Sequence, residues 1–212
     1  MIAPDRLAVF ALTAFVLIVI PGPSVLFVVS RALSYGRRAA LRTVVGNALG
    51  EGVIVVAVAV GVGALVEESV LVFTIMKLVG AAYLILLGIK AIRDRRSLVT
   101  LLEPAVAPRT DRRTLLDGVV VGLTNPKSLI FFAAILPQFA NRSAGHVPLQ
   151  LIVLGVIFIL IALVSDTAWG IAAGGLRTWF ARSPRRLERI GGAGGLVMIG
   201  LGTRLALTGR HD

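Results

Sequence analysis

Six long apolar runs, separated by short polar connections, dominate the chain. They cover approximately residues 7–30, 43–65, 70–91, 115–138, 148–174 and 190–208. A helix needs about 20 mostly apolar residues to cross roughly 30 Å of hydrocarbon, and each run meets that length. The pattern therefore predicts an all-α, polytopic membrane protein with six transmembrane helices, folded as a single membrane domain over residues 1–212.

The composition supports this interpretation. Of the 212 residues, 57% are hydrophobic, and the mean hydropathy is +0.91. Such a chain is too apolar for a soluble domain of this length. It contains no cysteine, which excludes disulfides, thiol chemistry and cysteine-based metal sites.

The positive charge is concentrated in alternate connections between the runs. The first, third and fifth connections hold the basic clusters: Arg31, Arg37, Arg38 and Arg42; Lys90, Arg93, Arg95, Arg96, Arg109, Arg112 and Arg113; Arg177, Arg182, Arg185, Arg186 and Arg189. The second and fourth carry only Glu67, Glu68 and Arg142. By the positive-inside rule, the basic connections are cytoplasmic and both termini lie outside. The net charge of +11 thus reflects topology, and no aromatic-interleaved basic face indicates nucleic-acid binding.

A long third connection, residues 93–113, divides the chain into two halves, 1–92 and 114–212. Each half holds three runs, and an odd number of spans would insert two repeats in opposite directions. Residues 80–88 resemble residues 192–200, with Lys77 and Arg189 at the same offset before them. We therefore expect two inverted three-helix repeats joined by a cytoplasmic linker.

Two proline-containing stretches interrupt the first and fourth runs. They are Pro21-Gly22-Pro23-Ser24 and Asn125-Pro126-Lys127-Ser128. Proline removes a backbone donor and clashes with the preceding turn, so neither stretch should continue a regular helix. At ~1.5 Å per residue, ten to eleven residues from the cytoplasmic ends place both stretches ~15 Å deep. Broken first and fourth helices are predicted to line one central cavity, although a simple kink against a neighbouring helix is the alternative for each.

Charged residues inside the runs are the next candidates. A charge at the membrane centre costs a few kcal/mol, so it normally faces a partner or a water-filled cavity. Glu51 and Asp166 are the lone carboxylates of the middle helix in each half, and we expect them to couple transport to protons or to bind a substrate amine. Structural carboxylates, paired with Lys127 or bonded to freed backbone amides, are the alternative.

Polar residues around the breaks have two possible roles. Lys127 is predicted to hold a substrate carboxylate or neutralise an acid, and a fixed ion pair is the alternative. The hydroxyls of Ser24 and Ser128 are available to a ligand or to their own helix carbonyls. Asn47 and Asn125 need partners in lipid, and Asn125 is placed to cap the helix that follows. Asp117 is expected to cap a helix start and Lys77 to extend towards water.

Three features together carry a resemblance to a known family: Pro21-Gly22-Pro23, then Gly118 with Asn125-Pro126-Lys127, and Lys77-x-x-Gly80-Ala81-Ala82-Tyr83-Leu84-x-x-x-Gly88. On them, the chain resembles the LysE/RhtB family of amino-acid exporters over nearly its whole length. The resemblance implies a small bacterial inner-membrane exporter of amino acids or similar metabolites, energised by the proton motive force.

The expected function follows from the candidate residues together with the family resemblance. Half-helix N-termini at the two breaks, with Lys127, would hold a substrate carboxylate, while Glu51 or Asp166 would exchange the amine for a proton. A divalent metal-ion or other small-metabolite exporter is the alternative. A metal site is disfavoured because the chain offers no cysteine, no membrane histidine and only two deep carboxylates as ligands. We expect no enzymatic activity, no cofactor and no metal site. A homodimer is possible, because the glycine-rich segment 191–195 offers a tight packing face to either this chain or a second copy.

Overall fold

The computed structural model of the protein describes residues 2–68, 70–93, 110–181 and 184–207. All secondary structure in these residues is helical, which confirms the predicted all-α class. It consists of eight α-helices with short π and 3-10 segments. The predicted linker falls largely on residues 94–109, outside the described residues.

The first predicted break is present. Helix α1 (Pro4–Val19) ends before Pro21, and α2 (Pro23–Tyr35) begins at the second proline of the stretch. Pro23 stands at the first helical positions, where its fixed φ favours a helix start and its missing N–H costs nothing. The two helices meet at a bend of 51°.

The second predicted break has the same construction. Helix α5 (Asp111–Thr124) ends at Asn125, and α6 (Pro126–Ile130) begins at the proline. The Asn125 side chain accepts a hydrogen bond from the Lys127 amide at 3.1 Å, so the predicted cap is present. Helix α6 continues into a π segment (Phe131–Ile135) and a 3-10 turn (Leu136–Phe139). The segment Pro126–Phe139 is bent by 42° from α5.

Four longer helices complete the fold: α3 (Arg37–Glu68), α4 (Val70–Arg93), α7 (Val147–Ala181) and α8 (Pro184–Leu207). Within the described residues, Arg37–Gly61 and Val147–Ala173 are long and apolar enough to cross a membrane alone. Counting each bent pair as one span gives four such crossings, and Gly192–Leu207 is a shorter apolar helix.

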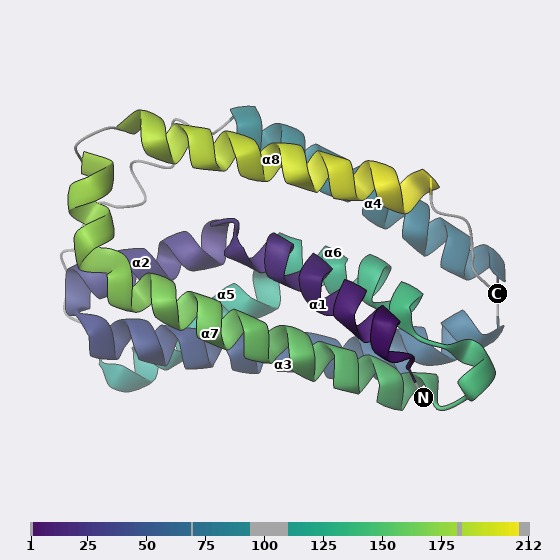
Figure 1. Ribbon diagram of the computed structural model, residues 1–212. Helices are drawn as coiled ribbons and strands as arrows, with labels where there is room; N and C mark the ends of the chain where they lie inside the picture. Colours follow the sequence, from purple (N-terminus) through teal and green to yellow (C-terminus); the bar gives the residue numbers. More distant parts are fainter. Residues whose placement is uncertain (1, 69, 94–109, 182–183, 208–212) are drawn as a thin grey trace.

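The connections alternate between the two ends of the molecule. The start of α1, the α3–α4 junction and the start of α7 lie at one end, while the α2–α3 junction lies at the other (Figure 1). Six crossings require this alternation. The inverted repeat and the domain division stay predictions.

Glycines set the closest helix contacts. A Cβ added to Gly46 of α3 would lie 2.2 Å from a backbone oxygen of α5, and one added to Gly50 would lie 2.4 Å from another. In the same way, a Cβ added to Gly118 or Gly122 of α5 would lie 2.5 Å or 2.2 Å, respectively, from a backbone oxygen of α3. Small residues at a spacing of four let two membrane helices touch along their backbones. Helices α3 and α5 therefore form one interlocked pair.

Helix α8 uses its glycines in the same way against α4. A Cβ on Gly195 would lie 2.5 Å from the Gly88 oxygen, and one on Gly88 would lie 2.5 Å from the Gly195 oxygen. The two helices run side by side at the edge of the molecule (Figure 1). The tight packing face predicted for this span is thus used at Gly195 within the chain.

A cluster of phenylalanines fixes the end of the broken pair α5–α6. Phe131 and Phe132 of the π segment lie with their ring centroids 4.7 Å from that of Phe158 on α7, and Phe10 of α1 lies 5.8 Å from Phe131. All four side chains are buried. This packing holds the second break against α1 and α7.

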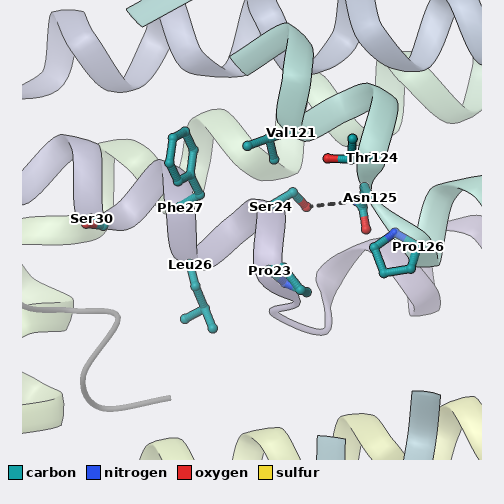
Figure 2. Close-up of a pocket in the computed structure, with 9 residues that line it drawn as sticks. All are labelled: Pro23, Ser24, Leu26, Phe27, Ser30, Val121, Thr124, Asn125 and Pro126. Carbon is teal, nitrogen blue, oxygen red and sulfur yellow. Dashed lines mark hydrogen bonds between the residues drawn. The ribbon is translucent and has the colours of Figure 1, made fainter. Parts of the chain in front are cut away.

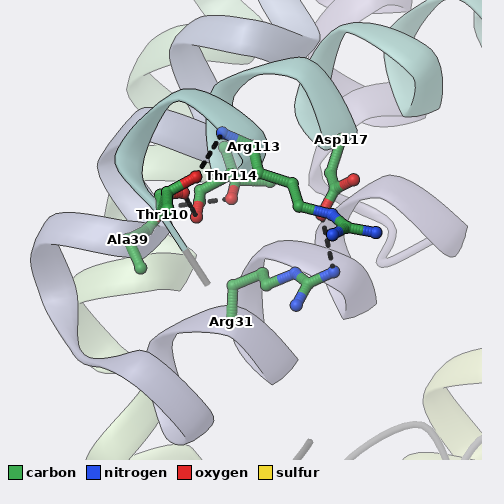
Figure 3. A network of polar contacts seen from close by, with 7 residues as sticks. Arg31, Ala39, Thr110, Arg113, Thr114 and Asp117 are labelled. Atoms are coloured by element: carbon green, nitrogen blue, oxygen red, sulfur yellow. Dashed lines mark hydrogen bonds and ion pairs between the residues drawn. The ribbon is translucent and has the colours of Figure 1, made fainter. Parts of the chain in front are cut away.

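Asp117 does not have its predicted role. Helix α5 begins at Asp111, and Thr110 caps it by accepting from the Arg113 amide at 3.4 Å. Asp117 lies more than a turn further along, where its carboxylate pairs with Arg31 of α2 at 3.2 Å (Figure 3).

Candidate functional site

The two helix breaks meet in the interior of the protein. The side-chain amide of Asn125 donates to the Ser24 hydroxyl at 3.2 Å and to the Ser128 hydroxyl at 3.0 Å. All three side chains are buried. One asparagine thus caps its own helix and also links it to the start of α2 (Figure 2).

Glu51 of α3 joins the same network. The Ser128 hydroxyl donates to Glu51 Oε1 at 2.6 Å, and only 2% of the Glu51 residue surface is exposed. The other carboxylate oxygen, Oε2, is buried and has no hydrogen-bond partner in the described part of the chain. A buried charged oxygen without a partner is costly, whereas a protonated carboxyl is far cheaper to bury.

The second carboxylate, Asp166 of α7, lies against α3. The Asn47 amide donates to Asp166 Oδ2 at 3.4 Å, and both residues are buried. Asn47 Oδ1 is buried, and no described residue bonds to it. Asn47 and Glu51 are four residues apart on α3, so they share one face of that helix. The interlocked glycines of α3 and α5 place this face beside the second break.

Lys127 has a role that the sequence did not indicate. Its ammonium donates to the Leu17 carbonyl at 2.6 Å and the Ile20 carbonyl at 2.9 Å, at the end of α1. The Leu17 carbonyl would bond to residue 21 in a continuous helix, but proline there has no N–H. A cation at a helix C-terminus also offsets the negative end of the helix dipole. Lys127 therefore ties α6 to the broken end of α1.

No ion pair joins Lys127 to a carboxylate in the part of the chain that the structure describes. Lys127 nevertheless lies in the same buried region as Glu51, which bonds to the neighbouring Ser128, and Asp166, which bonds to Asn47. Two carboxylates and one ammonium therefore share this buried region without being neutralised by direct contact.

A pocket of about 320 Å³ lies between α2 and α5 beside the two breaks. Its polar lining comes from Ser24, Ser30, Thr124 and Asn125, and Pro23 and Pro126 also line it (Figure 2). Three apolar side chains complete the wall: Leu26, Phe27 and Val121.

The start of α2 faces this region with free backbone donors. Gly22 precedes the helix and supplies no side-chain cap. The amides of Ser24 and Val25 lie in the first turn, where helix geometry offers no acceptor. A helix terminus of this kind attracts anions, because its amide groups and the positive end of the helix dipole point the same way. By contrast, the start of α6 is already occupied by the Asn125 side chain.

The structure brings most of the predicted site residues together. Seven are buried around the breaks: Ser24, Asn47, Glu51, Asn125, Lys127, Ser128 and Asp166. Pro21 and Gly22 form the connection between α1 and α2, while Pro23 and Pro126 line the pocket. The sequence analysis missed the glycine pairs Gly46/Gly50 and Gly118/Gly122, although their spacing of four is visible in the sequence. It also missed the Arg31–Asp117 ion pair, which has no local sequence signal.

These features define a class: a helical membrane protein with two broken helices around a buried polar site, as in secondary transporters. The LysE type translocator family model matches residues 15–209. The chain belongs to the LysE type translocator family, whose members are transporters and not enzymes.

Relatives match over almost the whole chain. An uncharacterized membrane protein of Vibrio cholerae is 36% identical, covering 93% of this chain and 94% of its own. A homoserine/homoserine lactone efflux protein of Salmonella typhimurium is 33% identical, covering 95% and 96%. A leucine efflux protein of Enterobacter sp. strain 638 is 28% identical, covering 93% of each chain. No solved structure matches significantly.

Proposed function

We propose that this protein exports small amino acids or close derivatives across the bacterial inner membrane by proton antiport. The observation that carries the proposal is the buried junction of the two breaks. There Asn125 donates to Ser24 and Ser128, and Ser128 donates to Glu51. Broken backbone at membrane depth is stable only beside protein or a water-filled cavity. Two breaks that meet at one polar junction are therefore typical of a transport site.

The substrate class draws on the relatives and on the pocket. Proteins named for efflux of homoserine, homoserine lactone and leucine are similar over nearly the full length. A pocket of about 320 Å³ with mixed polar and apolar walls suits a small molecule with one short side chain.

The substrate carboxylate is better assigned to the start of α2 than to Lys127. The Lys127 ammonium already serves the Leu17 and Ile20 carbonyls. The uncapped amides of Ser24 and Val25 lie beside the pocket and attract an anion. The amine would then turn to Asp166 or Glu51.

Proton coupling is assigned to the two carboxylates. Glu51 Oε2 has no hydrogen-bond partner among the described residues, so this oxygen is free to hold and release a proton. Asp166 accepts a long hydrogen bond, 3.4 Å from the Asn47 amide, which leaves room for exchange. Protonation of these groups would alternate with binding of the substrate amine.

Alternating access would come from rocking one three-helix half against the other. The contact pattern supports inverted halves: α3 packs on broken pair α5–α6, α7 packs on broken pair α1–α2, and α4 packs on α8. The termini are assigned to the outside by the basic connections. If a homodimer forms, its interface lies away from Gly195, which already packs against α4.

Replacing Asp166 by Asn, and separately Glu51 by Gln, tests the proposal in proteoliposomes with an imposed pH gradient. We expect either change to abolish pH-driven export while the protein still inserts and folds. Asp5→Asn, which alters an exposed carboxylate on α1, is the matched control and should export normally. Undiminished pH-driven export by both site variants would refute proton coupling through these residues.

The metal-ion alternative gains no support from the geometry. Among the described residues, no group of three or more histidine, cysteine or carboxylate side chains is arranged to hold a metal. A divalent cation would need such a ligand set at the site. Metal transport without amino-acid transport in the same proteoliposomes would reverse this choice.

A further inference from the structure

An ion pair joins α2 to α5 just beyond the residues that line the pocket. Arg31 Nη2 on α2 lies 3.2 Å from Asp117 Oδ2 on α5, and the two side chains are 8% and 25% exposed. We propose that this pair is the gate on the pocket side that faces the cytoplasm, and that it must open for a substrate to enter. The inference rests on the proposed transport function.

The position of the pair follows from the direction of the two helices. The pocket is lined on α2 from Pro23 to Ser30 and on α5 from Val121 to Thr124. Arg31 follows Ser30 directly, and Asp117 lies one turn before Val121. Both helices lead away from the breaks towards the basic connections, which the positive-inside rule assigns to the cytoplasm. The pair therefore lies next to the lining residues at that end of the pocket.

Arg31 also contacts the wall of the pocket. Its guanidinium carbon lies 4.5 Å from the ring centroid of Phe27, which lines the pocket, and 5.5 Å from that of Tyr35. Cations within about 6 Å of a ring face are attracted to it. Moving Arg31 off Asp117 would therefore also release a wall side chain.

Little direct packing holds together the two helices that the pair joins, away from the Asn125–Ser24 bond at the breaks. In the described residues, α2 and α5 pack against each other only marginally, whereas α5 is interlocked with α3 along its glycines. A polar contact can act as a gate only where packing does not already fix the distance. The Arg42–Asp111 pair shows the contrast, because it joins α3 to α5, the interlocked helices, and is far more exposed (41% and 70%).

Thiol labelling tests the gate directly, since the natural chain has no cysteine. Val121→Cys places one thiol inside the pocket, and its labelling rate is measured with a hydrophilic maleimide in permeabilised membranes. Arg31→Ala and Asp117→Asn are each added to this variant. We expect the rate to rise about tenfold in both, which converts to about 1.4 kcal/mol of lost closed-state stability.

Two further variants make the result specific. Exchanging the charges (Arg31→Asp with Asp117→Arg) should return the rate to that of the parent. Asp111→Asn, the matched control at the exposed pair, should leave the rate unchanged. Equal labelling in the parent and in both single variants would overturn the gate.

Folding and function are read out separately. If a single variant elutes as an aggregate in size-exclusion chromatography, the charge-exchanged protein decides: slow labelling supports the gate, and fast labelling in a folded protein overturns it. If labelling responds as expected but no amino acid is exported by the parent, the proposed function fails and not the gate.

Discussion

Asn125 and Ser24 are 101 positions apart in the chain, yet the Asn125 amide donates to the Ser24 hydroxyl at 3.2 Å. The bond joins the starts of α2 and α6, the two helices that follow the breaks. The site is therefore organised by two helix starts that share one asparagine, and not by either break alone.

Asn125→Ala should destabilise this junction. The change removes the cap of α6 and leaves the Ser24 and Ser128 hydroxyls short of a buried partner, which costs about 1–3 kcal/mol. Thermal unfolding of the purified protein in detergent measures the loss. A double-mutant cycle with Ser24→Ala should give a coupling of about 0.5–3 kcal/mol. Thr203→Val, which removes a helix-internal hydroxyl bond at an exposed position of α8, is the control. Additive effects of the Asn125 and Ser24 changes would contradict the link.

Lys127→Gln distinguishes a structural lysine from a substrate-binding one. The change removes a cation from one buried and one partly buried carbonyl, and each charge-assisted bond contributes about 1.5–3 kcal/mol. We expect lower stability, and equal loss of transport for a small amino acid and for its carboxylate-free lactone. Lys90→Gln, at an exposed position of α4, should change neither. Selective loss of the carboxylate-bearing substrate would instead return Lys127 to carboxylate binding.

How much of this site was predictable depends on whether the signal is local. The breaks at Pro21 and Pro126 follow from proline chemistry within four residues, and the Asn125 cap follows from its position before proline. The partners of Lys127 could not be predicted, because they are carbonyls freed by a break about a hundred residues earlier. Likewise, Asp117 has arginines close by in sequence, but its ion pair is with Arg31 on another helix.

Gly50→Ala should disturb the interlock of α3 and α5. The added Cβ would lie 2.4 Å from the Val119 oxygen, which is backbone and cannot turn aside. Overpacking of this kind costs about 1–3 kcal/mol and should also displace Glu51, the next residue on α3. Gly61→Ala is the control on the same helix, because its Cβ would meet nothing within 4 Å. Unfolding midpoints in detergent compare the two, and equal midpoints would contradict the close contact.

Single cysteines can test the predicted orientation, because the natural chain contributes no thiol background. Ser143 is exposed in the connection before α7, and Arg38 is exposed in the first turn of α3. The start of α7 and the start of α3 lie at opposite ends of the molecule (Figure 1). The positive-inside rule assigns the first, basic connection to the cytoplasm and the fourth to the outside. A membrane-impermeant maleimide should therefore label Ser143→Cys in intact cells and Arg38→Cys only after permeabilisation. The reverse labelling would place both termini inside and would turn the end of the pocket next to Arg31 and Asp117 towards the outside.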